Sequence, residues 1–413
     1  MFDSSKRQIG FAPPSIDNEC IAAVERVLRS GWITSGPELK AFENDLETYL
    51  KSPRVLCFSS WTTACELALI WFGVGPGDDV LIPAMTYAAT ANIVLHCGAR
   101  PVMVDIDPIE RVVTLEKLQA AWTPKTKAVM PVDLGGWPVD YKAIGNWLNS
   151  APIRERFQAS SAVQEAFGRP LFISDAAHSF GAHIENMPVG TQADITGFSF
   201  HAVKNLTTAE GGALSFSLPS SLDLDQTTAW FRSMSLHGQS KSALEKTQSG
   251  TWQYDVVEAG YKCNMTDIQA AIGRSQLRNY PDHLNRRKEI AAQYTKALET
   301  VTWCTLPVLK DATRESAYHL FSIRINRFQS AQRDVLIARL KEDGIATNVH
   351  FIPLPLLSLH RNRGEHMRHY PESEACFNEQ LSLPIHLHLN DEDVNWIVER
   401  LCYHVGELMT SHA

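Results

Sequence analysis

The N-terminal part of the chain is dominated by amphipathic segments of helical period. Apolar residues recur at helical spacing over residues 16–28, and Ser15 or Asp17 can cap this segment. Gly31 marks its end, because glycine readily ends a helix in the left-handed conformation. A second amphipathic stretch covers Leu39–Leu50. The pattern therefore predicts two helices before the first strand.

Seven short apolar runs follow, and each has the length and composition of a buried strand. Helical segments separate several of them, for example near Ala88–Cys97. This alternation predicts an α/β fold in which a mostly parallel mixed sheet is flanked by helices. The runs are RVLCFSS, VLIPA, PVMVDID, AVMPVDL, LFISDA, ITGFSFH and GALSFSL.

The pattern changes near Asp267, where longer helical segments begin. One strand-like run, YHLFSIRI, interrupts them, and further helices are expected at Ala331–Asp343 and Asp391–Leu408. We therefore predict two domains. A large domain would cover residues 1–265, and a smaller α/β domain would cover residues 266–413.

Composition and charge narrow the classes of partner. The 413 residues are 44% hydrophobic and carry a formal net charge of −8, without a block of lysine or arginine. Neither a nucleic acid nor an anionic membrane is therefore an expected partner, and a small molecule is favoured. The N-terminal stretch lacks the apolar centre of a signal peptide, and no apolar run is long enough to span a membrane.

The eight cysteines are scattered and form no C-x-x-C pair, which is typical of a reduced cytoplasmic protein. His386 and His388 alternate along a strand end, but no third ligand lies near them in the sequence. We therefore expect no metal site.

An acid and a lysine carry the strongest chemical signal. Asp175 ends the apolar run LFIS, and the carboxyl ends of such strands are where open α/β sheets bind ligands. Lys204 follows the next strand-like run and its loop. A pyridoxal phosphate site needs a lysine that bonds the cofactor aldehyde and an acid beside the pyridine nitrogen. A turn or cap residue is the plain alternative for Asp175 alone.

Small hydroxyl residues offer a cradle for the cofactor phosphate. Thr62 and Thr63 stand at the start of a buried helix, where free N–H groups and the helix dipole favour an anion. Helix capping by Ser59 or Ser60 is an equally open interpretation. The other candidate contacts are Tyr87, which could stack on a planar ring, and Ser199, which could bond the phosphate.

Six motifs together resemble the sugar aminotransferases of the DegT/DnrJ/EryC1/StrS family, which have pyridoxal phosphate fold type I. The resemblance extends from about residue 10 to about residue 405. The motifs are FSFHAVKNLTTAEGGAL, ISDAAHSFGA, SSWTTACELAL, PAMTYAATAN, RSGWITSGP and GYKCNMTDIQAAIGRSQL.

The resemblance implies a homodimer with shared active sites that transfers an amino group, usually from L-glutamate, to a keto sugar. The cofactor would alternate between pyridoxal and pyridoxamine phosphate through aldimine and ketimine stages, with release of 2-oxoglutarate. Lys204 would be the covalent lysine, and Asp175 would pair with the pyridine nitrogen. The other implied cofactor contacts are His178 near the 3-hydroxyl, Tyr87 on the ring, Thr62, Thr63 and Ser199 at the phosphate, and Asn264 from the second subunit.

Four further residues fall in loops that border the sugar site of the family: Trp32, Thr34, Ser35 and His350. The chain departs from the family pattern at Asp133, where histidine is common, and in the longer polar segment 149–168. Two other functions stay open. The same cofactor could support elimination or dehydration on a sugar, and the scaffold could serve a non-catalytic regulator.

Overall fold

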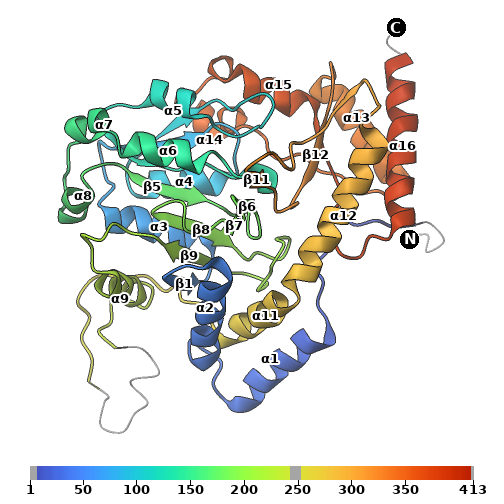
Figure 1. The fold of residues 1–413 in the computed structure, drawn as a ribbon. Helices are drawn as coiled ribbons and strands as arrows, with labels where there is room; N and C mark the ends of the chain where they lie inside the picture. The colour runs from blue at the N-terminus through green and yellow to red at the C-terminus, as the bar shows by residue number, and fades with distance from the viewer. Residues whose placement is uncertain (1–6, 242–252, 411–413) are drawn as a thin grey trace.

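The computed structural model describes residues 7–241 and 253–410 of the chain. The first six residues, which belong to the stretch considered above for a targeting signal, lie outside the described residues. A central sheet with helices on both sides forms one part of the molecule, and α12, α13 and α16 gather beside it around smaller strands (Figure 1). The observed α/β architecture confirms the prediction from the hydrophobic pattern.

The central sheet has seven strands in the order β1-β9-β8-β5-β4-β2-β3. Strand β9 is antiparallel to both of its neighbours, and the pairs from β8 to β3 are parallel. The predicted mostly parallel mixed sheet is therefore confirmed. Its strands are β1 (Arg54–Phe58), β2 (Asp79–Pro83), β3 (Arg100–Val104), β4 (Thr126–Val129), β5 (Leu171–Asp175), β8 (Ile195–Ser199) and β9 (Gly212–Phe216).

Helices cover both faces of this sheet, and its central strands are therefore buried on both sides. The most apolar of them, α3, packs against β1, β8 and β9, as its nearly continuous apolar sequence predicts. The helices of this part are α1 (Asn18–Ser30), α2 (Pro37–Leu50), α3 (Trp61–Phe72), α4 (Ala88–His96), α5 (Leu115–Ala121), α6 (Tyr141–Leu148), α7 (Ala151–Arg156), α8 (Ala162–Phe167) and α9 (Leu224–Met234).

The two N-terminal helices begin in different ways. The side chain of Asp17 accepts a hydrogen bond from Cys20 N at 2.7 Å, so the aspartate is the cap of α1. Helix α2 has no cap of its own, and Asp267 takes this role from the far side of the sequence. Its carboxylate accepts hydrogen bonds from the N–H groups of Gly36, Glu38 and Leu39. Asp267 thus helps to join α2 to the later part of the chain.

The later part of the chain has its own apolar core, which includes residues from Ile290 to Leu408. Its sheet has the order β10-β12-β13, and a further small sheet has the order β11-β6-β7. The boundary near residue 265 stays a prediction. The elements are α11 (Asp267–Arg278), α12 (Tyr280–Leu298), β10 (Cys304–Thr305), β11 (Arg314–Glu315), β12 (Phe321–Ile325), α13 (Ser330–Glu342), α14 (Ser358–Arg361), α15 (Pro371–Glu379), β13 (Gln380–Leu383), α16 (Asp391–Thr410), β6 (His183–Ile184) and β7 (Met187–Pro188).

The segment 149–168, predicted as helix and loop, folds as the short helices α7 and α8. Gln164 of α8 is buried, and its side-chain amide donates to the carbonyls of Phe72 and Gly73. The segment therefore packs onto the end of α3. Among the described residues, no helix has both the length and the apolar character needed to cross a bilayer.

Candidate functional site

The carboxyl edge of the central sheet carries a pocket of about 430 Å³. Asp175 is the last residue of β5, and Ser199 is the last residue of β8. Lys204 follows in a turn in which its N–H donates to the carbonyl of His201. Seven residues predicted from the sequence line this pocket: Thr62, Tyr87, Asp175, His178, Ser199, Lys204 and His350.

Asp175 is buried, with 4% of its surface exposed. Its carboxylate accepts hydrogen bonds from the Thr90 hydroxyl at 2.8 Å and from Ala177 N at 3.2 Å. Burial raises the pKa of Asp175 to about 6, against the opposing effect of these hydrogen bonds and of Lys204. A cationic N–H placed in the pocket would stabilise this buried carboxylate.

Lys204 is partly buried and faces the same pocket. Burial lowers the pKa of its amine to about 8, although the charge of Asp175 acts in the opposite direction. An amine of this pKa has a usable unprotonated fraction near neutral pH. Lys204 therefore has the electrostatic character of a nucleophile and a base.

The N-terminus of α3 forms one wall of the pocket through Ser60, Trp61 and Thr62. Ser60 caps the helix by accepting from Thr63 N at 3.1 Å. The N–H groups of Trp61 and Thr62 belong to the first turn, so they have no acceptor within the helix. The structure therefore fits both the capping interpretation and the phosphate-binding interpretation of this motif, because the helix is capped and still presents donors to an anion.

Gly212 at the start of β9 permits this close approach. A Cβ at this position would lie 2.3 Å from Trp61 N and 2.5 Å from Ser60 C, which is too close for any side chain. The glycine thus lets the first turn of α3 lie directly against the sheet edge.

Aromatic groups also line the pocket. Tyr87 has 64% of its surface exposed, and its ring centroid lies 5.7 Å from that of Phe351. The ring of Phe351 also lies 5.8 Å from that of His178. A planar ligand can therefore meet aromatic faces in this pocket.

Asp133, noted above as a departure from the family pattern, lies in a buried polar network near the start of the turn after β4. Its carboxylate accepts hydrogen bonds from Tyr141 Oη at 2.7 Å, Ser179 Oγ at 2.6 Å and Val139 N at 3.0 Å. Burial raises the pKa of Asp133 to about 7. The acid does not line the pocket but ties the turn after β4 to the segment that carries His178.

The sequence reasoning did not identify three residues of the site. Thr90 lies three positions after Tyr87, and helical spacing in PAMTYAATAN could have indicated it. His319 lines the pocket next to His178. Asn205, directly after Lys204, bonds the ring of His319. No local pattern predicts the last two contacts, because 114 residues separate Asn205 from His319.

Five predicted residues do not line the Lys204 pocket of the described chain: Thr63, Trp32, Thr34, Ser35 and Asn264. The hydroxyl of Thr63 lies within hydrogen-bonding distance of Ser59 and Ser60. Asn264 instead donates to Ser35 Oγ at 2.5 Å, and Trp32 Nε1 donates to Ser35 O at 3.2 Å. Thr34 O accepts from Asp267 N, so the last four residues form a second cluster at the start of α2 and α11.

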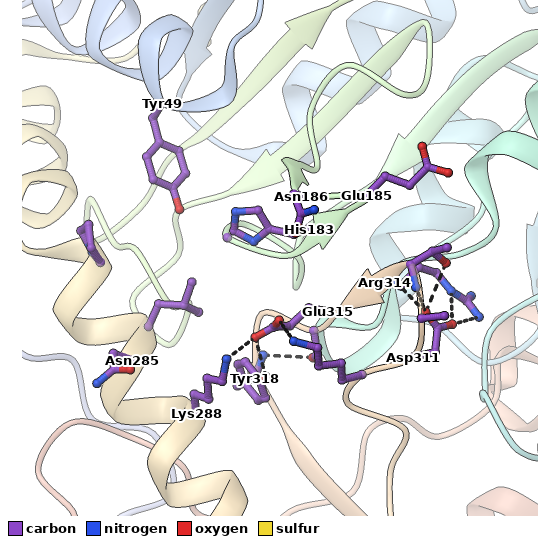
Figure 2. A pocket seen from close by; sticks show the side chains of 17 residues that line it. Tyr49, His183, Glu185, Asn186, Asn285, Lys288, Asp311, Arg314, Glu315 and Tyr318 are labelled. Carbon is purple, nitrogen blue, oxygen red and sulfur yellow. Dashed lines mark hydrogen bonds and ion pairs between the residues drawn. The ribbon is translucent and has the colours of Figure 1, made fainter.

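A separate hollow of about 590 Å³ lies beside α12 and the sheet β11-β6-β7 (Figure 2). Its cations are engaged in ion pairs, because Glu315 binds Lys288 and Lys310, and Asp311 binds Arg314. None of the predicted site residues lines it. Within the described residues, no group of three or more His, Cys, Asp or Glu side chains could hold a metal ion.

The Lys204 pocket fits pyridoxal phosphate. The buried Asp175 suits a protonated ring nitrogen, Lys204 suits the aldehyde, and the first turn of α3 suits the phosphate. The side chain of Tyr87 is exposed enough to cover a ring.

Comparison with known proteins gives an independent result. The family model of the DegT/DnrJ/EryC1/StrS aminotransferases matches residues 14–153 and 157–402. The interruption falls within the polar segment 149–168. The spore coat polysaccharide biosynthesis protein SpsC of Bacillus subtilis is 35% identical over 394 residues, which are 94% of this chain and 95% of the relative.

Solved structures show the same likeness. A Streptococcus pneumoniae protein described as a sugar aminotransferase, in its PMP form, has 42% identity and a TM-score of 0.93. The match covers 97% of this chain and 100% of that chain. Helicobacter pylori PseC, an aminotransferase involved in the biosynthesis of pseudoaminic acid, has 25% identity and a TM-score of 0.84 over 97% of this chain and 100% of its own.

Proposed function

The chain belongs to the DegT/DnrJ/EryC1/StrS family of pyridoxal-phosphate-dependent sugar aminotransferases and has fold type I; from this premise we propose that it transfers an amino group from L-glutamate to a nucleotide-linked keto sugar. The observation that carries the proposal is the meeting of Lys204 and Asp175 in one pocket. The names of the relatives, which refer to polysaccharide and pseudoaminic acid biosynthesis, support a sugar as the acceptor.

Each residue of the site has a role in this proposal. When bound, pyridoxal phosphate supplies an electron sink for bond breaking at the amino-bearing carbon. Asp175 keeps a proton on the ring nitrogen, because a buried carboxylate favours a cationic partner. Lys204 Nζ would bond the cofactor aldehyde and would serve as the base that moves protons at the reacting carbon. The first turn of α3 and Ser199 hold the phosphate.

We further propose a homodimer in which each chain completes the site of the other. Trp32, Thr34, Ser35 and Asn264 form a cluster apart from the Lys204 pocket, and this separation supports a role in the partner's site. Large apolar side chains are exposed nearby along the chain, and dimer formation would bury such groups. They are Ile16, Ile21 and Leu28 of the α1 region, Ile33, and Tyr254, Val256, Val257 and Tyr261 before α11.

A cytoplasmic location completes the proposal. All eight cysteines are unpaired, including the partly exposed Cys97, Cys304 and Cys402. Unpaired thiols are typical of proteins that work in a reducing compartment.

The test has two parts. Reduction of the purified protein with borohydride should attach the cofactor to Lys204, which peptide mapping by mass spectrometry would locate. A panel of keto sugars, free and linked to different nucleotides, is then assayed with L-glutamate for 2-oxoglutarate and the amino sugar. Sugar turnover without 2-oxoglutarate would instead favour elimination or dehydration, and attachment to another lysine would contradict the assigned site.

A further inference from the structure

Two histidine rings lie against each other in the wall of the Lys204 pocket. His178 follows β5, and His319 precedes β12, so they come from segments far apart in the sequence. Their ring centroids are 4.4 Å apart with an interplanar angle of 39°. Both are buried, with 7% and 6% of their surfaces exposed, and both line the pocket. Their hydrogen bonds determine what each ring can offer to a ligand.

A backbone donor defines the protonation of His178. Gly135 N lies 3.2 Å from its Nδ1 and donates to it. A backbone N–H can only donate, so Nδ1 accepts and carries no proton. Gly135 has a φ of 70°, a conformation that glycine adopts without strain, which lets its N–H point at the ring. In the neutral ring the proton is therefore on Nε2, and His178 is a donor there.

A side-chain amide defines the opposite tautomer for His319. Its Nδ1 lies 2.9 Å from Asn205 Oδ1. The other amide atom, Asn205 Nδ2, donates to Ala317 O at 2.7 Å. Rotating the amide would place two carbonyl oxygens against each other, so the observed orientation is the favourable one. His319 must then donate from Nδ1, and its Nε2 is left with a lone pair.

The surroundings keep both rings neutral. Burial lowers the pKa of His178 and of His319 well below the ordinary value, and the cation of Lys204 acts in the same direction on both. His350 also lowers the pKa of both rings, and Arg287 lowers that of His319. Two stacked imidazolium rings would in addition repel each other.

We propose that His178 and His319 form a neutral pair of opposite tautomers, and that Nε2 of His319 accepts a hydrogen bond from a hydroxyl group of the substrate. The assignment of this hydroxyl to a sugar rests on the proposed function, whereas the assignment of the tautomers does not. A lone pair repels the carboxylates of an amino-acid donor but suits the hydroxyls of a sugar. His319 is thus a specificity residue for the sugar, and Asn205 and Gly135 are positioning residues.

The tautomers are tested without any turnover. Neutron diffraction from deuterium-exchanged crystals near pH 7, with cofactor removed or bound, shows deuterium atoms on ring nitrogens directly. The expected result is deuterium on Nε2 of His178 and on Nδ1 of His319. Deuterium on the other nitrogen of either ring, or on both nitrogens of either ring, would overturn the pair.

Variants of His319 test the hydroxyl contact. His319→Gln keeps a hydrogen-bonding group near the place of Nε2, whereas His319→Asn keeps only a group near Nδ1. Loss of one neutral hydrogen bond should raise KM for the accepted keto sugar by about 3- to 10-fold in His319→Asn. His319→Gln should stay closer to wild type, and KM for L-glutamate should change little in either.

Two results for His319→Asn would overturn this contact. One is an equal rise of KM for the keto sugar and for L-glutamate, and the other is an unchanged KM for the keto sugar. If the wild-type protein accepted no keto sugar at all, this would contradict the proposed function instead. The neutron diffraction result would still decide the tautomers. The two failures are therefore distinguishable.

Discussion

The hydroxyl of Thr90 donates a hydrogen bond of 2.8 Å to Oδ2 of Asp175, across 85 residues of sequence. Thr90 lies on α4 and Asp175 ends β5, so the bond joins a helix to the edge of the central sheet. Thr86 Oγ1 lies 2.9 Å from Thr90 Oγ1 and extends the network. The hydrogen bond stabilises the carboxylate form of Asp175, which is the form that its proposed contact with the ring nitrogen of the cofactor requires.

Thr90→Val should therefore weaken the site while preserving the shape of the side chain. A buried acceptor loses its donor, which costs about 1–2 kcal/mol in the free energy of unfolding. The pKa of Asp175 should rise further, and the protein should retain pyridoxal phosphate less well in equilibrium dialysis. Thr90→Ser keeps the hydroxyl and is the matched control. Equal cofactor affinity in the valine variant and the wild type would contradict this role.

The amine of Lys204 should titrate with a pKa of about 8 in the cofactor-free protein. At pH 7 its unprotonated fraction is then roughly 300-fold larger than that of an ordinary lysine. The rate of its reaction with added pyridoxal phosphate should follow this titration. Asp175→Asn should lower the pKa of Lys204 further, because the charge of Asp175 raises it. A titration near pH 10.5, or an upward shift in the variant, would count against the assignment.

The same titration predicts how stability depends on pH. The folded-state pKa of Lys204 is below that of the unfolded chain, so the unfolded state binds more protons between about pH 8 and 10.5. Below pH 8 the burial of the Lys204 ammonium lowers the free energy of unfolding by its full amount. This destabilisation decreases as pH rises through the window. Urea unfolding of the cofactor-free protein should therefore show wild type gaining stability relative to Lys204→Met from pH 8 to 10.5.

Gly212→Ala should prevent the close approach of α3 to the sheet edge. The added Cβ would lie 2.3 Å from Trp61 N, so the first turn of α3 must move. We expect cofactor affinity to fall by at least about 10-fold, since donors at a helix N-terminus act over short distances. Gly75→Ala is the control, because a Cβ there meets no atom within 4 Å. Similar cofactor affinities in the two variants would show that the close contact between α3 and β9 does not contribute to cofactor binding.

Asp267→Ala should destabilise the junction of α2 and α11. Three N–H groups at the start of α2 would lose their acceptor, at a cost of about 1–2 kcal/mol. Asp267→Asn keeps one acceptor oxygen and should lose less. Urea unfolding monitored by circular dichroism measures both, and an unchanged midpoint for the alanine variant would refute the capping role.

Mixing two inactive variants should test the shared active sites. Lys204→Ala removes the lysine proposed to bond the cofactor, and Asn264→Ala removes a residue proposed to serve the partner. After subunit exchange, half of the dimers combine both variants, and each mixed dimer has one intact site. Recovery of up to about a quarter of wild-type activity is therefore expected. A mixture that stays inactive although an affinity tag on one variant captures the other, untagged variant would argue against shared sites.

Much of the site could be predicted because its signals are local. Asp175 ends an apolar run, and Lys204 follows the next one, so strand ends alone placed both at one sheet edge. Ser60 and Thr62 were recognisable at the start of an apolar helix. The contacts of His319 and Asp267 were not predictable, because a hydrogen bond across more than a hundred residues leaves no pattern in either segment.

By itself, the sequence determined the order of the elements, the mostly parallel sheet and the placement of the lysine and the acid after neighbouring strands, because periodicity and strand ends are local properties. Tertiary structure alone decided the electrostatic state of the site. Burial set the pKa of Lys204 to about 8, and distant partners gave His178 and His319 opposite hydrogen-bonding roles. The physical reason is that pKa values and tautomers depend on desolvation and on the neighbours of each group, which only the folded chain brings together.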